Sequence, residues 1–250
     1  MKEKTKKYPP ECAVFVISSG CVDCNGLHTT GAPTQYGRMR IDVYSCCWFE
    51  PFDLNQLKPL TYFSKGTVYQ LGNQLDLKDS TIDTYISRFL RYKEIHRLKN
   101  GLYVSADFFD KNKNDISYSF YLANIIRTPS YVSSWAALQY YNLTTEAIHS
   151  VTSVTTKVTR DYQTKVGNFA YQSINKSLFT DFILAKGKFD FFIASPSKAV
   201  FDLLYFRTSQ FRGVPLKKIK ALVEDLRVDI DEMDKDEQSK FYVMVERYLS

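Results

Sequence analysis

The stretch from Lys78 to Ser105, KDSTIDTYISRFLRYKEIHRLKNGLYVS, places a helical pattern directly before a hairpin pattern. The pattern predicts a helix from Thr81 to about Lys93 with one buried face. The apolar residues of that face are Ile82, Tyr85, Ile86, Phe89 and Leu90. The Asn100-Gly101 dipeptide then lies between two β-prone runs, which predicts a hairpin with a type I′ turn. Such a helix and hairpin either read DNA together or complete a small core.

The residues before this stretch supply two further helix starts. Asp53 can cap a short helix that ends near Pro59, and Ser64 can cap a helix over about Lys65–Leu71. Asp79 or Ser80 is the expected cap of the third helix. Three short helices followed by a hairpin predict a winged helix-turn-helix over residues 51–108, and the polar run at 107–115 predicts a linker.

A second block follows, from residue 116 to 250. ISYSFYLANII and YVSSWAALQYYNL predict helices, whereas IHSVTSVTT, GNFAYQSI and KFDFFIAS predict strands. Ser195-Pro196 begins another helix, and two more helices are expected at the C-terminal end. The predicted fold class is α+β, with the winged helix followed by a larger mixed α/β domain that has a small sheet and C-terminal helices.

Residues 1–50 differ from the rest because they contain all five cysteines: Cys12, Cys21, Cys24, Cys46 and Cys47. Cys21 and Cys24 have the CxxC spacing of a zinc site, but adjacent Cys46 and Cys47 chelate one metal awkwardly. A disordered leader or a non-native extension, with Met39 as a later start, is favoured over a metal site. We therefore expect no metal and no cofactor.

The net charge of +6 is spread unevenly along the chain. Residues 116–220 carry a net charge of +8 and residues 221–250 carry −5, a distribution that fits either a surface facing a polyanion or a solvated basic face. No apolar run approaches the roughly 20 residues that span a bilayer, and a signal peptide is only weakly suggested. A cytoplasmic protein is expected.

A DNA-reading helix must present polar and cationic side chains to a groove while its other face stays buried. Arg88 and Arg91 are the cationic candidates on the third helix, with Thr81 and Thr84 placed for base edges or phosphates. The full set of candidate DNA-binding residues is Thr81, Thr84, Ser87, Arg88, Arg91, Arg97, Lys99 and Asn100. The alternative is a winged helix used for protein contact or only as a scaffold.

Enzymatic chemistry has little support in the sequence. No P-loop, GxGxxG, GxSxG or HExxH motif occurs, and His28, His96 and His149 lack a neighbouring catalytic partner. A satisfied structural role is expected for His96 and His149. The acidic run from Asp229 to Glu237 lacks the ligand spacing of an EF-hand and predicts a solvated turn. We expect no enzyme.

Five segments in order resemble the AbiEi-type antitoxins of bacterial type IV toxin–antitoxin systems, which act in abortive phage infection. The segments are ISRFLRYKEIHRLKNGLYV (86–104), PSYVSSWAALQYYNLTTEA (129–147), VTSVTTKVTRDY (151–162), GNFAYQSI (167–174) and IASPSKAVFDLLYF (193–206). Their order and spacing match the family over roughly residues 52 to 210. The family usually has Pro-Glu-Lys-Ala where this chain has Pro196-Ser197-Lys198-Ala199, and residues 1–50 match nothing in the family.

The resemblance implies a transcriptional regulator whose winged helix binds inverted repeats in the promoter of its own operon and represses it. The domain over 116–250 would counteract a nucleotidyltransferase-like toxin, with or without direct contact. Its candidate residues are Lys157, Arg160, Lys198 and Asp202. The alternative is an interaction module that neutralises a toxin by contact without binding DNA. A third possibility is phosphoryl transfer by Lys198 and Asp202, although a pair four residues apart is more often a surface contact.

Overall fold

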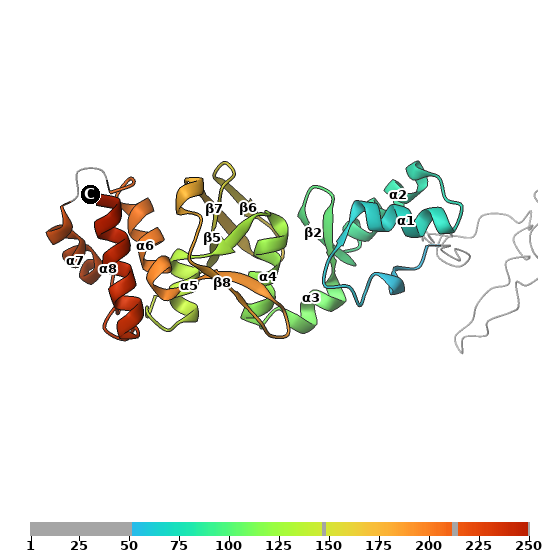
Figure 1. Ribbon diagram of the computed structural model, residues 1–250. Helices are drawn as coiled ribbons and strands as arrows, with labels where there is room; N and C mark the ends of the chain where they lie inside the picture. The colour runs from blue at the N-terminus through green and yellow to red at the C-terminus, as the bar shows by residue number, and fades with distance from the viewer. Residues whose placement is uncertain (1–51, 147–148, 212–214, 250) are drawn as a thin grey trace, which may run out of the picture. The chain divides into compact units, whose positions relative to one another are not determined.

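The computed structural model describes residues 52–146, 149–211 and 215–249 (Figure 1). Over these residues the chain is a mixed α+β protein with eight α-helices and two sheets. Residues 50–250 form one compact unit. The predicted leader and all five cysteines lie outside the described residues.

The first part of the described chain builds a three-stranded antiparallel sheet in the order β1-β3-β2. Two helices pack on this sheet, so that Ile82, Ile86 and Phe89 lie in one buried cluster with Phe63 and Tyr103. The elements are η2 (Leu54–Gln56), β1 (Phe63–Ser64), α1 (Lys65–Gln74), α2 (Asp79–Arg91), β2 (Ile95–Lys99) and β3 (Leu102–Ser105).

In the first part of the described chain, side chains cap η2 and α1 but not α2. Asp53 caps η2, and Ser64 caps α1 in a reciprocal arrangement with Thr67. The cap expected at Asp79 or Ser80 is wrong: α2 begins at Asp79 itself, after Lys78, and no side chain caps it. Asp79 in the first turn still interacts favourably with the positive end of the helix dipole.

The hairpin predicted at Asn100-Gly101 is confirmed, but its turn type is not. Lys99 pairs with Leu102 across the turn, and a bulge interrupts the ladder between Arg97 and Lys99. Gly101 has φ +75°, whereas Asn100 is not among the residues with positive φ. A type I′ turn needs positive φ at both positions, so this turn is of another type.

The linker expected at 107–115 is mostly helix. Helix α3 (Ala106–Asn112) follows β3 directly, and Asp115 then caps α4 (Ile116–Ile126) by accepting a hydrogen bond from the Ser117 amide. The segment is polar because one side of a short surface helix is solvated, while Phe108 and Phe109 pack against the larger core.

A six-stranded mixed sheet forms the centre of the second part, in the order β6-β7-β5-β4-β9-β8. The pairs β5–β7 and β4–β9 are parallel and the other neighbours are antiparallel. Its strands and the short elements between them are β4 (Ser130–Val132), α5 (Ser134–Tyr140), β5 (Ser150–Thr155), β6 (Arg160–Gln163), β7 (Asn168–Ser173), η3 (Lys176–Leu178), β8 (Phe182–Ala185) and β9 (Phe191–Ala194).

This sheet confirms three predicted strands and corrects one helix. The predicted strands at IHSVTSVTT, GNFAYQSI and KFDFFIAS correspond to β5, β7 and β9. YVSSWAALQYYNL is not helical throughout, because its first residues belong to β4 and only Ser134–Tyr140 forms α5. The strands β6 and β8 at the two edges were not predicted.

Three helices complete the described chain: α6 (Pro196–Arg207), α7 (Leu216–Asp225) and α8 (Lys235–Leu249). Helix α6 is buried on almost every side, with nine consecutive buried residues from Ser197 to Tyr205. Aromatic side chains of α6 and α8 meet at Phe201, Tyr205 and Tyr248. No helix among the described residues is both long enough and apolar enough to cross a membrane.

The three-stranded sheet is covered on both faces. Tyr103 lies in the cluster with α1 and α2, whereas Leu102 and Val104 belong to the larger cluster with α4. All four residues of β3 are therefore buried. Polar contacts add to this junction, since the Tyr118 hydroxyl donates to the Thr61 carbonyl at 2.8 Å.

Gly72 provides a test of how closely α1 and α2 pack. A Cβ at this position would lie 2.6 Å from Cγ1 of Ile82, which is fully buried. Although alanine favours helices, we predict that Gly72→Ala lowers the free energy of unfolding by about 1–3 kcal/mol through overpacking.

Gly66→Ala is the control in the same helix, because its Cβ would meet only Ser64 Oγ at 3.4 Å. Urea denaturation of the two variants measures the difference. Equal stability of both would contradict the close contact between α1 and α2.

Candidate functional site

Helix α2 has one buried face and one polar face. Ile82, Ile86 and Phe89 are buried, whereas Thr84, Ser87 and Arg91 are exposed and Thr81 and Arg88 are half-buried. The 3.6-residue period of the helix separates these sets. The predicted DNA-binding residues of α2 therefore share the face opposite the core.

The polar side chains of α2 are held close to the helix. The hydroxyls of Thr84 and Ser87 donate to the carbonyls of Ser80 and Asp83 at 2.9 and 2.8 Å. Their oxygens remain able to accept hydrogen bonds. The guanidinium groups of Arg88 and Arg91 lie over the rings of Tyr85 and Tyr92, at 5.8 and 5.0 Å from the ring centroids.

One acidic residue of α2 is paired with a lysine from α1. Lys65 Nζ lies 2.8 Å from Asp83 Oδ1, and this contact holds the pKa of the Asp83 carboxyl below its usual range. Both side chains are largely exposed, so the pair contributes little to stability. The pair affects the local charge instead. The Lys65 ammonium offsets the negative charge of Asp83, the acidic residue nearest in sequence to Ser87 and Arg88.

The candidate DNA-binding residues of the hairpin differ in their exposure and contacts. Arg97 is exposed, with its guanidinium 6.0 Å from the Tyr103 ring centroid, and Asn100 is exposed at the turn. Lys99, predicted to meet phosphates, instead donates from Nζ to the Ile126 carbonyl at 2.6 Å. This carbonyl lies at the C-terminal end of α4, where a cation is favoured. Lys99 therefore joins the hairpin to the second part of the chain.

The four candidates of the second domain do not form one site. Lys157 and Arg160 are exposed, and Arg160 lies 5.5 Å from the ring centroid of Tyr162. Lys198 and Asp202 are 1% and 0% exposed. The expected surface contact between these two is wrong, because α6 lies inside the molecule rather than on it.

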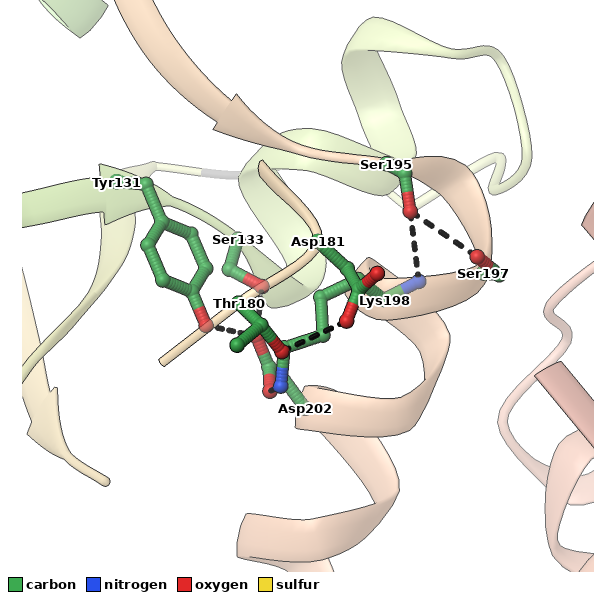
Figure 2. Close-up of polar contacts among 8 residues, drawn as sticks. All are labelled: Tyr131, Ser133, Thr180, Asp181, Ser195, Ser197, Lys198 and Asp202. Carbon is green, nitrogen blue, oxygen red and sulfur yellow. Dashed lines mark hydrogen bonds and ion pairs between the residues drawn. The ribbon is translucent and has the colours of Figure 1, made fainter. Parts of the chain in front are cut away.

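Lys198 and Asp202 are the centre of a buried polar network (Figure 2). Lys198 Nζ lies 2.7 Å from Asp202 Oδ1. The second carboxylate oxygen, Oδ2, accepts hydrogen bonds from Ser133 Oγ at 2.7 Å and from the Tyr131 hydroxyl at 3.0 Å. The network therefore ties α6 to β4 and to the residue before α5.

The start of α6 fixes the position of Lys198. Ser195 caps the helix, and its Oγ accepts a hydrogen bond from the Lys198 amide at 3.3 Å. Pro196 occupies the first turn, where no amide donor is needed. From this start the i,i+4 spacing brings Lys198 and Asp202 together on one side of the helix.

Burial is the largest influence on the pKa values of Asp202 and Tyr131. It raises the pKa of Asp202, while the Lys198 ammonium and the hydroxyls of Ser133 and Tyr131 act in the opposite direction. Burial also raises the pKa of Tyr131, which keeps this phenol protonated and able to donate. The aromatic rings of Phe179 and Phe182 cover Tyr131 at 5.0 and 4.7 Å between centroids.

A second carboxylate reaches the start of α6 from α8. Glu237 Oε2 accepts hydrogen bonds from the amide and the hydroxyl of Ser197 at 3.2 and 2.7 Å, and Oε1 contacts Lys240 at 2.7 Å. Burial raises the pKa of Glu237, but the hydrogen bonds from Lys240 and Ser197 outweigh it and lower that pKa. The predicted solvated turn is thus wrong for Glu237, which lies in the first turn of α8.

Arg127 is a buried cation that was not among the predicted site residues. Its guanidinium donates to the Val158 carbonyl and, at 3.4 Å, to the Tyr162 hydroxyl. It is 8% exposed. Arg127 therefore holds the β5–β6 connection, which carries Lys157, against the end of α4.

His96 is also buried in part, and its Nδ1 has no hydrogen-bond partner among the described residues. The satisfied role expected for it is therefore not found. Its ring meets Phe109 edge-to-face at 5.7 Å, and burial lowers its pKa. Within the described ranges no group of three His, Cys, Asp or Glu side chains is placed to hold a metal ion.

No protein-family model matches this chain, and no curated protein matches it either.

The buried network leads to a prediction on stability. Lys198→Met leaves the Asp202 carboxylate without its cation, and Asp202→Asn leaves the Lys198 ammonium without its anion. We predict that each single change lowers the free energy of unfolding by about 3–5 kcal/mol. The double variant should lose clearly less than the sum, because it buries no unpaired charge.

Chemical denaturation of the four proteins completes the cycle. Lys113→Met is the control, since its partner Asp110 lies at 3.3 Å in a pair that is mostly exposed, and its cost should stay below about 1 kcal/mol. Strict additivity of the two buried changes would show that the pair is not coupled.

Proposed function

We propose that the chain is a DNA-binding antitoxin of the AbiEi type. In this proposal residues 51–108 act as a winged helix-turn-helix that represses the chain's own operon. The unit over 116–250 counteracts a nucleotidyltransferase-like toxin. Neither activity needs a cofactor, and the protein acts in the cytoplasm on promoter DNA with inverted repeats.

The polar face of α2 carries the DNA-binding part of the proposal. Arg88 and Arg91 lie on the side away from the core, together with Thr84 and Ser87. The two arginines supply the cations that phosphate contact requires. The hydroxyl oxygens of Thr84 and Ser87 can accept hydrogen bonds from base edges or waters. The hairpin β2–β3 follows α2 directly and presents Arg97 and Asn100 to solvent.

The antitoxin part rests on how the segments of resemblance meet. Tyr131 and Ser133 come from the segment over 129–147, and Lys198 and Asp202 come from the segment over 193–206. These four side chains form the single buried network around Asp202. Residues that lie in separate segments of the resemblance therefore depend on one another in the folded chain, as expected if the segments mark one functional unit.

The alternative of phosphoryl transfer by Lys198 and Asp202 is disfavoured by their burial. A nucleophile or a phosphate-binding lysine must contact its substrate. At 1% and 0% exposure neither side chain reaches solvent. Their roles fit the stability of the unit rather than its chemistry.

DNA binding gives a direct test. We predict that Arg88→Ala with Arg91→Ala abolishes the mobility shift of the DNA upstream of the gene. At low salt, where residual binding can still be measured, the same change should reduce the slope of log affinity against log salt by about 1.8, the value for two lost phosphate contacts.

Arg207→Ala with Lys235→Ala is the matched control, because it removes the same charge from exposed positions on α6 and α8. Both double variants should keep the unfolding midpoint of the parent protein. An unchanged affinity at fixed salt for the Arg88/Arg91 variant would refute the assignment of α2.

Toxin neutralisation is tested separately by growth. The neighbouring gene is expressed alone and together with this chain under a promoter that the chain does not regulate. We predict that growth stops with the neighbouring gene alone and recovers with co-expression. The Arg88→Ala/Arg91→Ala variant should restore growth equally well, because the proposal assigns neutralisation to residues 116–250.

Failure of the double variant at equal protein level would mean that neutralisation requires the DNA-binding face. Co-purification of the toxin with a chain that shifts no DNA would instead favour the contact-only alternative.

A further inference from the structure

The two edges of the six-stranded sheet have opposite chemistry. The strand β6 at one edge reads Arg160-Asp-Tyr-Gln163, with two charged residues that discourage pairing with another strand. The strand β8 at the other edge reads Phe182-Ile-Leu-Ala185 and has no polar side chain. It lies in the orange part of the chain in Figure 1.

The outer side of β8 is unpaired within the described chain. Among the described residues β8 is hydrogen-bonded only to β9. Ile183 and Leu184 are 54% and 44% exposed, and Phe192, opposite Leu184 on β9, is 42% exposed. Apolar side chains thus surround a row of backbone donors and acceptors that lack strand partners, a combination that soluble proteins usually block or cover.

We propose that β8 is an interface between two copies of this chain, which pair antiparallel at this edge to continue the sheet through a two-fold axis. This inference does not depend on the proposed function. A two-fold contact is self-complementary, so the same four residues serve as both partners. The exposed Leu184 and Phe192 of each copy then extend one apolar face across the axis.

The charges that flank β8 favour the antiparallel arrangement. Asp181 precedes the strand, Lys186 follows it, and both are exposed. If the side chains of both copies alternate between the same two faces of one continuous sheet, either Ile183 or Leu184 can lie opposite the same residue of the other copy. In both registers Asp181 of one copy lies one position from Lys186 of the other copy. A parallel arrangement would instead place like charges together at each end.

The chemistry of β8 favours a second copy of this chain over a strongly charged partner. A strongly basic or acidic partner finds no complementary charge within β8 itself, because its four residues are all apolar. When two copies pair antiparallel, the apolar strands lie together. Lys186 of each copy then lies near Asp181 of the other. The short strand predicts a dimer that forms and dissociates with protein concentration.

Sedimentation velocity of the full chain over about a hundredfold range of concentration tests this interface. We expect reversible dimerisation, and we expect Ile183→Lys with Leu184→Lys to weaken it at least tenfold, because two lysines would face each other in each register. Val158→Lys with Val243→Lys is the control, since these residues are 79% and 58% exposed and the change adds the same charge elsewhere. It should dimerise like the parent.

A charge swap tests the direction of pairing with little change in the apolar surface. Lys186→Glu should weaken the dimer by placing two carboxylates together, and adding Asp181→Lys should restore it. Restoration in the double variant supports the antiparallel arrangement, and equal weakening in the single and double variants overturns it.

A parent chain that stays monomeric throughout the concentration range overturns the proposal. Hydrogen exchange then identifies what covers the edge: in the monomer, protection of the Leu184 amide, which points away from β9, indicates that another part of the same chain covers it. Dimerisation that survives both lysine substitutions also overturns it, since the contact must then lie elsewhere.

Discussion

The ion pair between Lys198 and Asp202 is the interaction on which the second part of the chain depends. Two opposite charges taken fully out of water are tolerated only with close geometry and further hydrogen bonds. Tyr131 and Ser133 supply those bonds, so the network fixes the register of α6 against β4 as well as its distance. An apolar contact would hold α6 in place without specifying which turn of the helix faces the sheet.

The three-stranded sheet gives the first part of the chain a similar dependence on the second. Its face toward α4 contributes Leu98, Leu102 and Val104 to the larger core, and Lys99 donates to the end of α4. The hairpin β2–β3 is therefore packed against α4 and the larger core. A change in the packing of α4 would affect the hairpin through Lys99 and Leu102. It would then also affect helix α2, because α2 packs on the same sheet.

Most features set by neighbouring residues were predictable from the sequence, although the cap of α2 and the turn type at Gly101 were not. Features set by distant contacts were not predictable. The stripe from Ile82 to Phe89, the cap at Ser64 and the hairpin at Gly101 each depend on residues within one or two turns. The partner of Lys99 lies 27 residues away and that of Ser133 lies 69 residues away. The burial of Lys198 had one visible signal: the run from Ala199 to Tyr205 is apolar except for Asp202.

The start of α6 receives its negative charge from a distant part of the chain. Glu237 of α8 brings a carboxylate to the Ser197 amide and hydroxyl at the start of α6. A helix N-terminus favours negative charge whichever residue carries it. Here the charge comes from a position 40 residues away along the chain, so α8 becomes part of the cap of α6. The α6 terminus therefore depends on α8 for its negative charge.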